Sequence, residues 1–120
     1  MKRIYIAGPY SADNPVDVFN NIREGLKVSA RILKEGNAPF APWLDWQFQM
    51  FEPSLVVEDY YRYSMAWLEA SDEILVLPGW ETSKGTRAEL ERAKELKIPI
   101  KFISPLERQP DDFGYDPILN

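Results

Sequence analysis

A short apolar segment, with a loop and a helix start behind it, is the feature that most constrains the fold. Residues 74–77, Ile-Leu-Val-Leu, have no polar alternation, which is typical of a parallel strand buried on both faces. Pro78-Gly79 ends this strand, the small residues Ser83, Gly85 and Thr86 form a loop, and a helix then begins with Thr86 as its expected N-cap. Such a loop collects backbone N–H groups at the carboxyl edge of a sheet, where anionic ligands bind. The segment therefore predicts a small-molecule site at that edge.

The same order of strand and helix recurs along the chain. Strands are expected at residues 4–7, 38–42, 74–77 and 99–103, and helices at residues 15–36, 53–70 and 86–97. Asn14 is the expected N-cap of the first helix and Gly36 its C-cap. Because strands and helices alternate, the sequence predicts an α/β three-layer sandwich, Rossmann- or flavodoxin-like, with a mostly parallel sheet of four or five strands.

Apolar spacing indicates the buried helix faces and the extent of the domain. The first helix is expected to bury an apolar stripe at Phe19, Ile22, Leu26, Ala30 and Leu33. The second is expected to bury Val57, Tyr60, Tyr61, Trp67 and Leu68. Residues 1–104 are expected to form one domain. The proline-containing tail, residues 105–120, has no core of its own and either wraps the surface or reaches a neighbouring subunit.

Composition excludes several classes of function. The net charge is −5 and there is no basic block, which argues against a nucleic-acid polymer as partner but leaves room for a single nucleotide. The chain has no Cys and no His. Disulfides and thiolate chemistry are thus excluded, no metal is expected, and acid–base chemistry falls to Asp, Glu or Tyr. We expect no signal peptide and no membrane span, and hence a cytoplasmic protein.

The loop before the third helix allows competing interpretations. Its Lys84-Gly85-Thr86 resembles the phosphate loop of nucleoside triphosphatases, but that motif needs Gly before Lys, so we reject it. Glu89 is three residues beyond Thr86. From the pattern alone, Thr86 and Glu89 form a capping box at the helix start, and a catalytic role for Glu89 is the alternative.

Three segments together resemble the nucleoside 2-deoxyribosyltransferase-like superfamily, which includes the 2'-deoxynucleoside 5'-phosphate N-hydrolases. They are residues 4–11 (Ile-Tyr-Ile-Ala-Gly-Pro-Tyr-Ser), residues 72–77, and residues 83–90 with Ala93. The resemblance implies that Glu89 is the nucleophile that attacks C1' of the deoxyribose. It also implies that Tyr5 holds this carboxylate and that Ser83 lies near the 5' end of the nucleotide.

One position departs from the family. Eight residues before Asp72, where the family carries an aspartate that contacts the sugar and assists base departure, this chain has Ser64. Asp45 is the acid that we assign to that role. In residues 43–51, Trp43 or Trp46 is expected to stack on a base. The alternative is that the aromatic side chains of this segment pack on the core or at a subunit interface. The expected substrate-binding residues are Gly8, Tyr10, Ser11, Trp43, Ser64, Gly79, Trp80, Ser83, Gly85 and Arg87.

These expectations define a function and its rivals. The resemblance implies cleavage of the N-glycosidic bond of a 2'-deoxynucleoside or its 5'-monophosphate, by hydrolysis or by transfer to another base, without a cofactor. The first rival is a non-catalytic nucleotide-binding or sensing module, and the second is a phosphate-binding α/β domain that serves as a structural partner. Sixteen aromatic residues in 120, together with the family's habit of sharing residues between subunits, predict a homodimer or a larger homo-oligomer.

Overall fold

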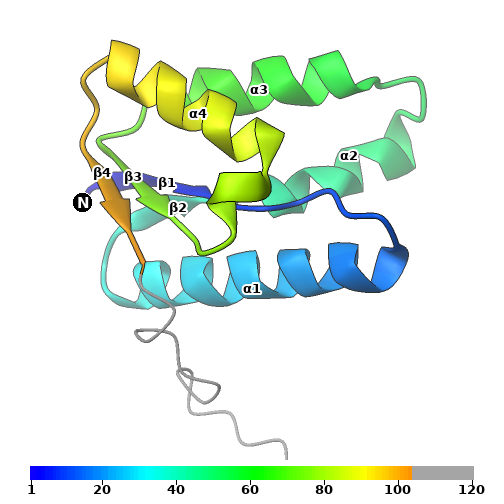
Figure 1. The fold of residues 1–120 in the computed structure, drawn as a ribbon, viewed down its shortest axis with the longest axis horizontal. Helices are drawn as coiled ribbons and strands as arrows, with labels where there is room; N and C mark the ends of the chain where they lie inside the picture. The colour runs from blue at the N-terminus through cyan, green and yellow to red at the C-terminus, as the bar shows by residue number, and fades with distance from the viewer. Residues whose placement is uncertain (104–120) are drawn as a thin grey trace, which may run out of the picture.

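The computed structural model describes residues 1–103, and the tail expected at 105–120 lies outside them. Four parallel strands form one sheet in the order β2-β1-β3-β4 (Figure 1). The elements in chain order are β1 (Arg3–Ala7), α1 (Pro15–Lys34), β2 (Ala38–Phe40), the 3-10 helix η1 (Pro42–Asp45), α2 (Trp46–Phe51), α3 (Val57–Glu69), β3 (Glu73–Val76), the 3-10 helix η2 (Trp80–Thr82), α4 (Lys84–Glu95) and β4 (Ile100–Phe102). The predicted α/β fold with a parallel sheet is confirmed.

Helices cover both faces of the sheet, which gives three layers. Figure 1 shows α1 on one side, and α3 with α4 on the other. Because side chains alternate along a strand, β1 contributes to both cores. Ile4 and Ile6 pack with Val28 and Ile32 of α1, whereas Tyr5 and Ala7 pack in the cluster that includes residues of α3 and α4. The central strand is thus buried on both faces. Within the described residues, the helices are too short or too polar to cross a membrane.

The caps of α1 agree with the sequence, but its buried stripe does not. Asn14 accepts a hydrogen bond from the backbone N–H of Asp17, and Gly36 has a φ of 92° just beyond the helix. The predicted stripe is wrong at both ends, because Phe19 is 70% exposed and Leu33 is 61% exposed. The buried residues of α1 are Gly25, Val28, Ser29 and Ile32. Gly25 and Ser29 carry no hydrophobic signal, and the missing side chain at Gly25 leaves room for the ring of Trp43.

The segment between β2 and β3 also differs from the prediction. A separate short helix, α2, precedes α3, and none of its residues is buried. α3 begins at Val57 and buries only Leu68, so Val57, Tyr61 and Trp67 lie exposed. Val57 and Tyr61 face a cavity, which leaves them uncovered, whereas Trp67 is partly covered because it stacks on Phe40 of the edge strand β2 at 5.6 Å.

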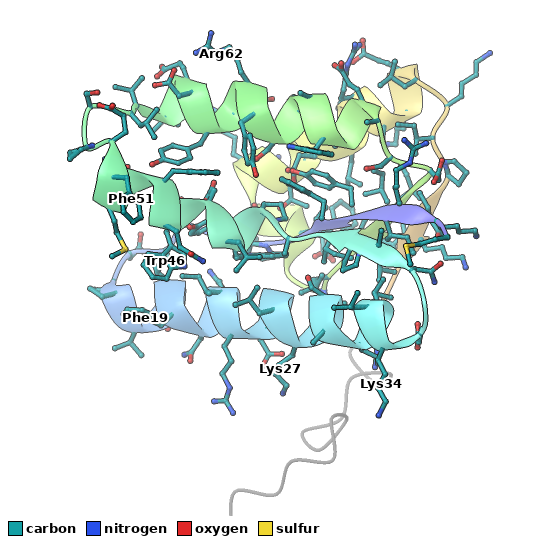
Figure 2. The ribbon with its side chains drawn as sticks, turned by 180° about the vertical axis from the view of Figure 1, so that it is seen from behind. Phe19, Lys27, Lys34, Trp46, Phe51 and Arg62 are labelled. Carbon is teal, nitrogen blue, oxygen red and sulfur yellow. The ribbon has the colours of Figure 1, made fainter. Side chains whose placement is uncertain are left out.

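Exposed aromatic side chains gather at one end of the molecule. Phe51 and Trp46 of α2 lie near Phe19 of α1 in Figure 2. Phe51 is 86% exposed, and Trp46 is about half exposed. We call Phe19, Trp46, Met50 and Phe51 the aromatic end. Its members carry large apolar side chains that the described part of the chain leaves uncovered.

Candidate active site

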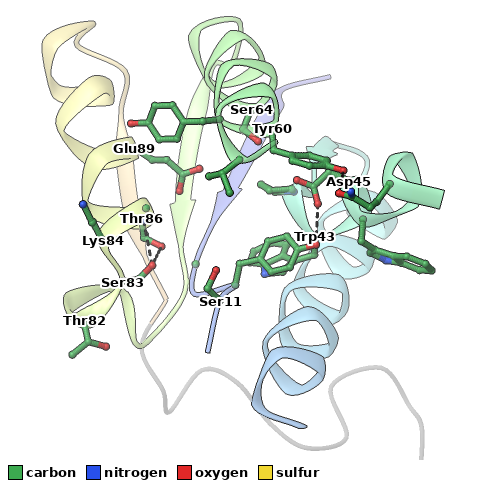
Figure 3. Close-up of a pocket in the computed structure, with 18 of the residues that line it drawn as sticks. Ser11, Trp43, Asp45, Tyr60, Ser64, Thr82, Ser83, Lys84, Thr86 and Glu89 are labelled. Atoms are coloured by element: carbon green, nitrogen blue, oxygen red, sulfur yellow. Dashed lines mark hydrogen bonds between the residues drawn. The ribbon is translucent and has the colours of Figure 1, made fainter. Parts of the chain in front are cut away.

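A cavity of about 850 Å³ opens at the carboxyl ends of the parallel strands. The loops after β1, β2 and β3 line it, together with one face of α3. One end holds Thr82, Ser83, Lys84 and Gly85 at the start of α4, and the opposite end holds Asp45 and several aromatic and apolar side chains. Figure 3 shows Ser83 and Lys84 on one side and Asp45 and Tyr60 on the other, with Glu89 lying toward the α4 side. The full lining is Gly8, Tyr10, Ser11, Pro42, Trp43, Asp45, Trp46, Gln49, Met50, Val57, Tyr60, Tyr61, Ser64, Thr82, Ser83, Lys84, Gly85, Thr86 and Glu89.

The start of α4 differs from the expected capping box. The N-cap is Ser83, whose Oγ accepts from the backbone N–H of Thr86 (3.3 Å) and from the Thr86 hydroxyl (2.8 Å). Thr86 is therefore inside the first helical turn, and the predicted Thr86 N-cap is wrong. Because Ser83 Oγ already accepts two hydrogen bonds, its hydroxyl proton is the remaining group it has to donate into the cavity.

Glu89 lies one turn further along α4, beside the central strand. The hydroxyl of Tyr5 donates a hydrogen bond to Glu89 Oε2. Burial raises the pKa of Glu89 to about 7, although the hydrogen bond from Tyr5 acts in the opposite direction. Burial and the nearby Glu89 carboxylate raise the pKa of Tyr5 well above its usual value, so Tyr5 keeps its proton. Ser64, on the cavity wall, acts in the opposite direction and lowers the pKa of Tyr5. This arrangement offers a carboxylate that is partly desolvated and held in place.

A second carboxyl group faces the cavity from η1. The hydroxyl of Tyr10 donates to Asp45 Oδ1 at 2.9 Å. Burial raises the pKa of Asp45, and the hydrogen bond from Tyr10 partly offsets the rise. A carboxyl group with a raised pKa holds its proton to a higher pH and can donate it to a departing group. The cavity thus contains two carboxyl groups from different elements.

Most of the predicted site residues lie together. Glu89, Asp45, Gly8, Tyr10, Ser11, Trp43, Ser64, Ser83 and Gly85 all line the cavity, and Tyr5 contacts Glu89. Trp43 is 1% exposed, so the half-exposed Trp46 offers the ring surface for stacking. Besides Tyr5, which reaches the site through Glu89, three predicted residues do not line the cavity. Gly79 forms the turn after β3 with a φ of 92°, Trp80 packs on Phe102 at 5.3 Å, and Arg87 is exposed on α4.

Sequence reasoning placed Ser64 at the site but missed the other residues that α3 contributes. Val57, Tyr60, Tyr61 and Ser64 line the cavity at helical spacing. Three of them lay on the face that the apolar pattern assigned to the core. The available signal was that Tyr60 and Ser64 lie four residues apart, so that their hydroxyl groups share one face of the helix. In the described residues, no cluster of three or more Asp and Glu side chains could hold a metal ion.

Comparison with known proteins places this geometry in context. No curated protein sequence matches significantly. Among solved structures, "2-desoxiribosyltransferase from Leishmania mexicana" is similar, with a TM-score of 0.56 and 23% sequence identity over 87% of this chain. The match covers 65% of that chain, so the present chain spans less than two thirds of its length. The likeness shows a related fold. Residues 2–102 match the family described as "Domain of unknown function (DUF4406)", and the chain belongs to that family.

Proposed function

We propose that this protein cleaves the N-glycosidic bond of a 2'-deoxynucleoside or its 5'-monophosphate, with Glu89 as the nucleophile. The observation that carries this proposal is the hydrogen bond from the buried Tyr5 to the half-buried Glu89 at the wall of a nucleotide-sized cavity. A nucleophilic carboxylate must be charged, held still and shielded from water. The fold likeness to a 2-deoxyribosyltransferase supports the same class of reaction.

The distribution of charge along the cavity supports one substrate orientation. Ser83, Gly85 and the only ammonium group in the lining, that of Lys84, lie at the α4 end. Helix N-termini with free N–H groups favour a phosphate or a 5'-hydroxyl. Trp46, Met50, Tyr60 and Tyr61 at the opposite end offer flat and apolar surface for a base. The deoxyribose then lies between the two ends, beside Glu89.

The reaction divides into two displacements at C1'. In the first, a Glu89 carboxylate oxygen forms a bond to C1' while the bond from C1' to the base nitrogen breaks, and its electron pair stays on the base. Asp45 supplies a proton to the leaving base. In the second, water attacks C1', its proton returns to Asp45, and Glu89 is released. A second base in place of water gives deoxyribosyl transfer.

A non-catalytic nucleotide-binding module is the second candidate. One observation favours it: Ser64, which lines the cavity, occupies the position at which the resembling superfamily carries an aspartate. In this candidate, Asp45 serves only as part of the pocket wall.

Free-base release separates the two candidates. The protein is incubated with each of the four common 2'-deoxynucleoside 5'-monophosphates and the matching nucleosides, with and without an acceptor base, and the products are separated by chromatography. Release of base supports catalysis, and a new nucleoside or nucleotide identifies transfer. A ligand-dependent rise in the melting temperature without base release supports the binding module. If none of these substrates gives base release or a rise in the melting temperature, both candidates are contradicted.

A further inference from the structure

Two hydrogen bonds join the loop after β1 to the 3-10 helix η1. The indole Nε1 of Trp43 donates to the carbonyl oxygen of Pro9 at 2.9 Å, and the hydroxyl of Tyr10 donates to Asp45 Oδ1 at 2.9 Å. Pro9 and Tyr10 are neighbours in one segment, and Trp43 and Asp45 are two residues apart in the other. Asn21 of α1 adds a bond to the Tyr10 carbonyl oxygen at 3.1 Å. The position of the Asp45 carboxyl is therefore tied to that of the Trp43 indole.

The Trp43 ring is itself confined by two glycines. A Cβ atom added to Gly25 of α1 would lie 2.3 Å from the ring, and one added to Gly8 would lie 3.2 Å from it. A glycine inside a helix costs about 1 kcal/mol relative to alanine. α1 nevertheless has a glycine at the point where the indole packs against it. This close fit leaves the ring little freedom to move.

We infer that Trp43 is a positioning residue for the general acid: seated against Gly25, it holds the loop that carries Tyr10, and through that loop it holds Asp45 toward the leaving base. The ring is buried, so it acts through Asp45. The catalytic consequence rests on the proposed function, whereas the positioning rests on the hydrogen bonds alone.

The first test compares two leaving groups. Trp43→Phe removes the N–H donor and keeps an aromatic ring. We expect kcat for base release to fall by about tenfold or more while KM changes little, because a misplaced acid affects the transition state. With 4-nitrophenyl 2-deoxyriboside 5-phosphate, whose leaving group needs no proton, kcat should stay near the wild-type value. Trp67→Phe, at a ring that stacks on Phe40 and does not line the cavity, is the matched control and should affect neither substrate. Equal losses on both substrates, or no loss on either, would overturn the inference.

The fit between Trp43 and Gly25 is tested by a second variant. Gly25→Ala displaces the indole and should give the same selective loss as Trp43→Phe. The double variant should be no worse than either single one, because both act through one contact; losses that simply multiply would count against the inference. If Trp43→Phe does not fold, site-specific benzothienylalanine at position 43 keeps the ring shape and removes only the N–H group.

A readout that does not need turnover separates this inference from the proposed function. Titration of the Asp45 carboxyl carbon is followed by NMR in the wild type, Trp43→Phe and Tyr10→Phe. The titratable groups that face Asp45 in the described residues are Tyr5, Tyr10, Tyr60 and Tyr63. The Tyr10 hydrogen bond lowers the pKa of Asp45, so both variants should raise it.

If the wild type releases neither base nor nitrophenol, the proposed function fails and this titration alone decides the inference. An Asp45 carboxyl that titrates identically in the wild type and in Trp43→Phe would overturn the positioning role.

Discussion

Glu89 is an acid whose surroundings oppose its charged form. Its pKa is raised to about 7 by burial, so the folded protein binds a proton there that the unfolded chain releases near pH 4.5. Between these two pH values the folded state holds more protons, and the contribution of Glu89 to the free energy of unfolding therefore falls as the pH rises. The total loss is about 3 kcal/mol and is complete above pH 7. A residue that lowers stability at neutral pH is typical of a functional site.

The variant Glu89→Gln separates the effect of Glu89 on the free energy of unfolding from its role in catalysis. Gln can still accept the hydrogen bond from Tyr5, but it has no charge and cannot attack C1'. We expect base release to fall by several orders of magnitude. The variant should gain stability relative to the wild type as the pH rises from 5 to 8, measured by urea unfolding at both pH values. Near-normal turnover would end the nucleophile assignment, and a stability difference that does not change with pH would show that Glu89 titrates normally.

Burial raises the pKa of Glu89, and Tyr5 limits the rise. Its hydrogen bond lowers the pKa of Glu89 against the effect of burial, so Tyr5→Phe should raise that pKa. The ascending limb of the plot of kcat/KM against pH, expected near pH 7 in the wild type, should move to higher pH. Activity at pH 7 should fall by about tenfold or more, the usual worth of a hydrogen bond to a charged group.

The matched control for Tyr5 is Tyr63→Phe. Tyr63 stacks edge-on to Phe48 at 5.4 Å and does not line the cavity. Removal of the Tyr63 hydroxyl should leave the ascending limb of the plot of kcat/KM against pH in place. A limb that stays near pH 7 in Tyr5→Phe would show that the hydrogen bond to Glu89 does not control its ionisation.

At the scale of elements, the N-terminus of α4 is the candidate phosphate site. Ser83 both caps this helix and points its remaining donor into the cavity. Ser83→Asp separates the two roles, because Asp caps a helix as well as Ser does but repels an anion. We expect the wild type to bind a 5'-monophosphate about tenfold or more tightly than the nucleoside. The variant should lose this preference while its melting temperature changes little.

The control for this charge is Asn14→Asp at the N-cap of α1. It adds the same charge at a helix start that does not line the cavity, and it should keep the phosphate preference. Titration calorimetry with nucleoside and nucleotide pairs measures the ratio. If the wild type itself shows no preference for the phosphate, α4 is not the phosphate site.

The sequence predicted elements well where the signal is local. The buried run before Pro78 gave β3, observed at Glu73–Val76, and the caps Asn14 and Gly36 bounded α1. Local signals failed at α4, because Ser83 and Thr86 are both residues that cap helices, and Glu89 three residues after Thr86 favoured the wrong one. Tertiary packing decided between them, since Tyr5 of the central strand bonds to Glu89.

The rest of the site depends on contacts between distant segments. Tyr10 and Asp45 are 35 residues apart, and nothing in either segment indicates that their side chains meet. The Trp43 ring was expected at a base because tryptophan is a common stacking residue. Its burial depends on Gly25, which carries no side chain and therefore no hydrophobic signal. Three-dimensional packing, which a single sequence does not display, is the missing information in both cases.

At the scale of the whole molecule, the aromatic end is an apolar surface that the described part of the chain leaves uncovered. α2 has no buried residue, and Phe51 is 86% exposed. Soluble monomers rarely expose such a cluster, and two of its members, Trp46 and Met50, also line the cavity. We therefore propose that a second copy of the chain covers the aromatic end, which would place the partner at the mouth of the cavity.

Oligomeric state and activity should then change together. Light scattering at micromolar concentration should give a dimer or a larger species for the wild type. Phe51→Ser and Phe19→Ser should shift it toward monomer and lower base release, because each puts a polar group into an apolar interface. Leu33→Ser is the matched control, since Leu33 is also exposed but lies in the last turn of α1, far along the helix from Phe19. A monomeric wild type with full activity would show that the aromatic end has no role in assembly and that one chain completes the cavity by itself.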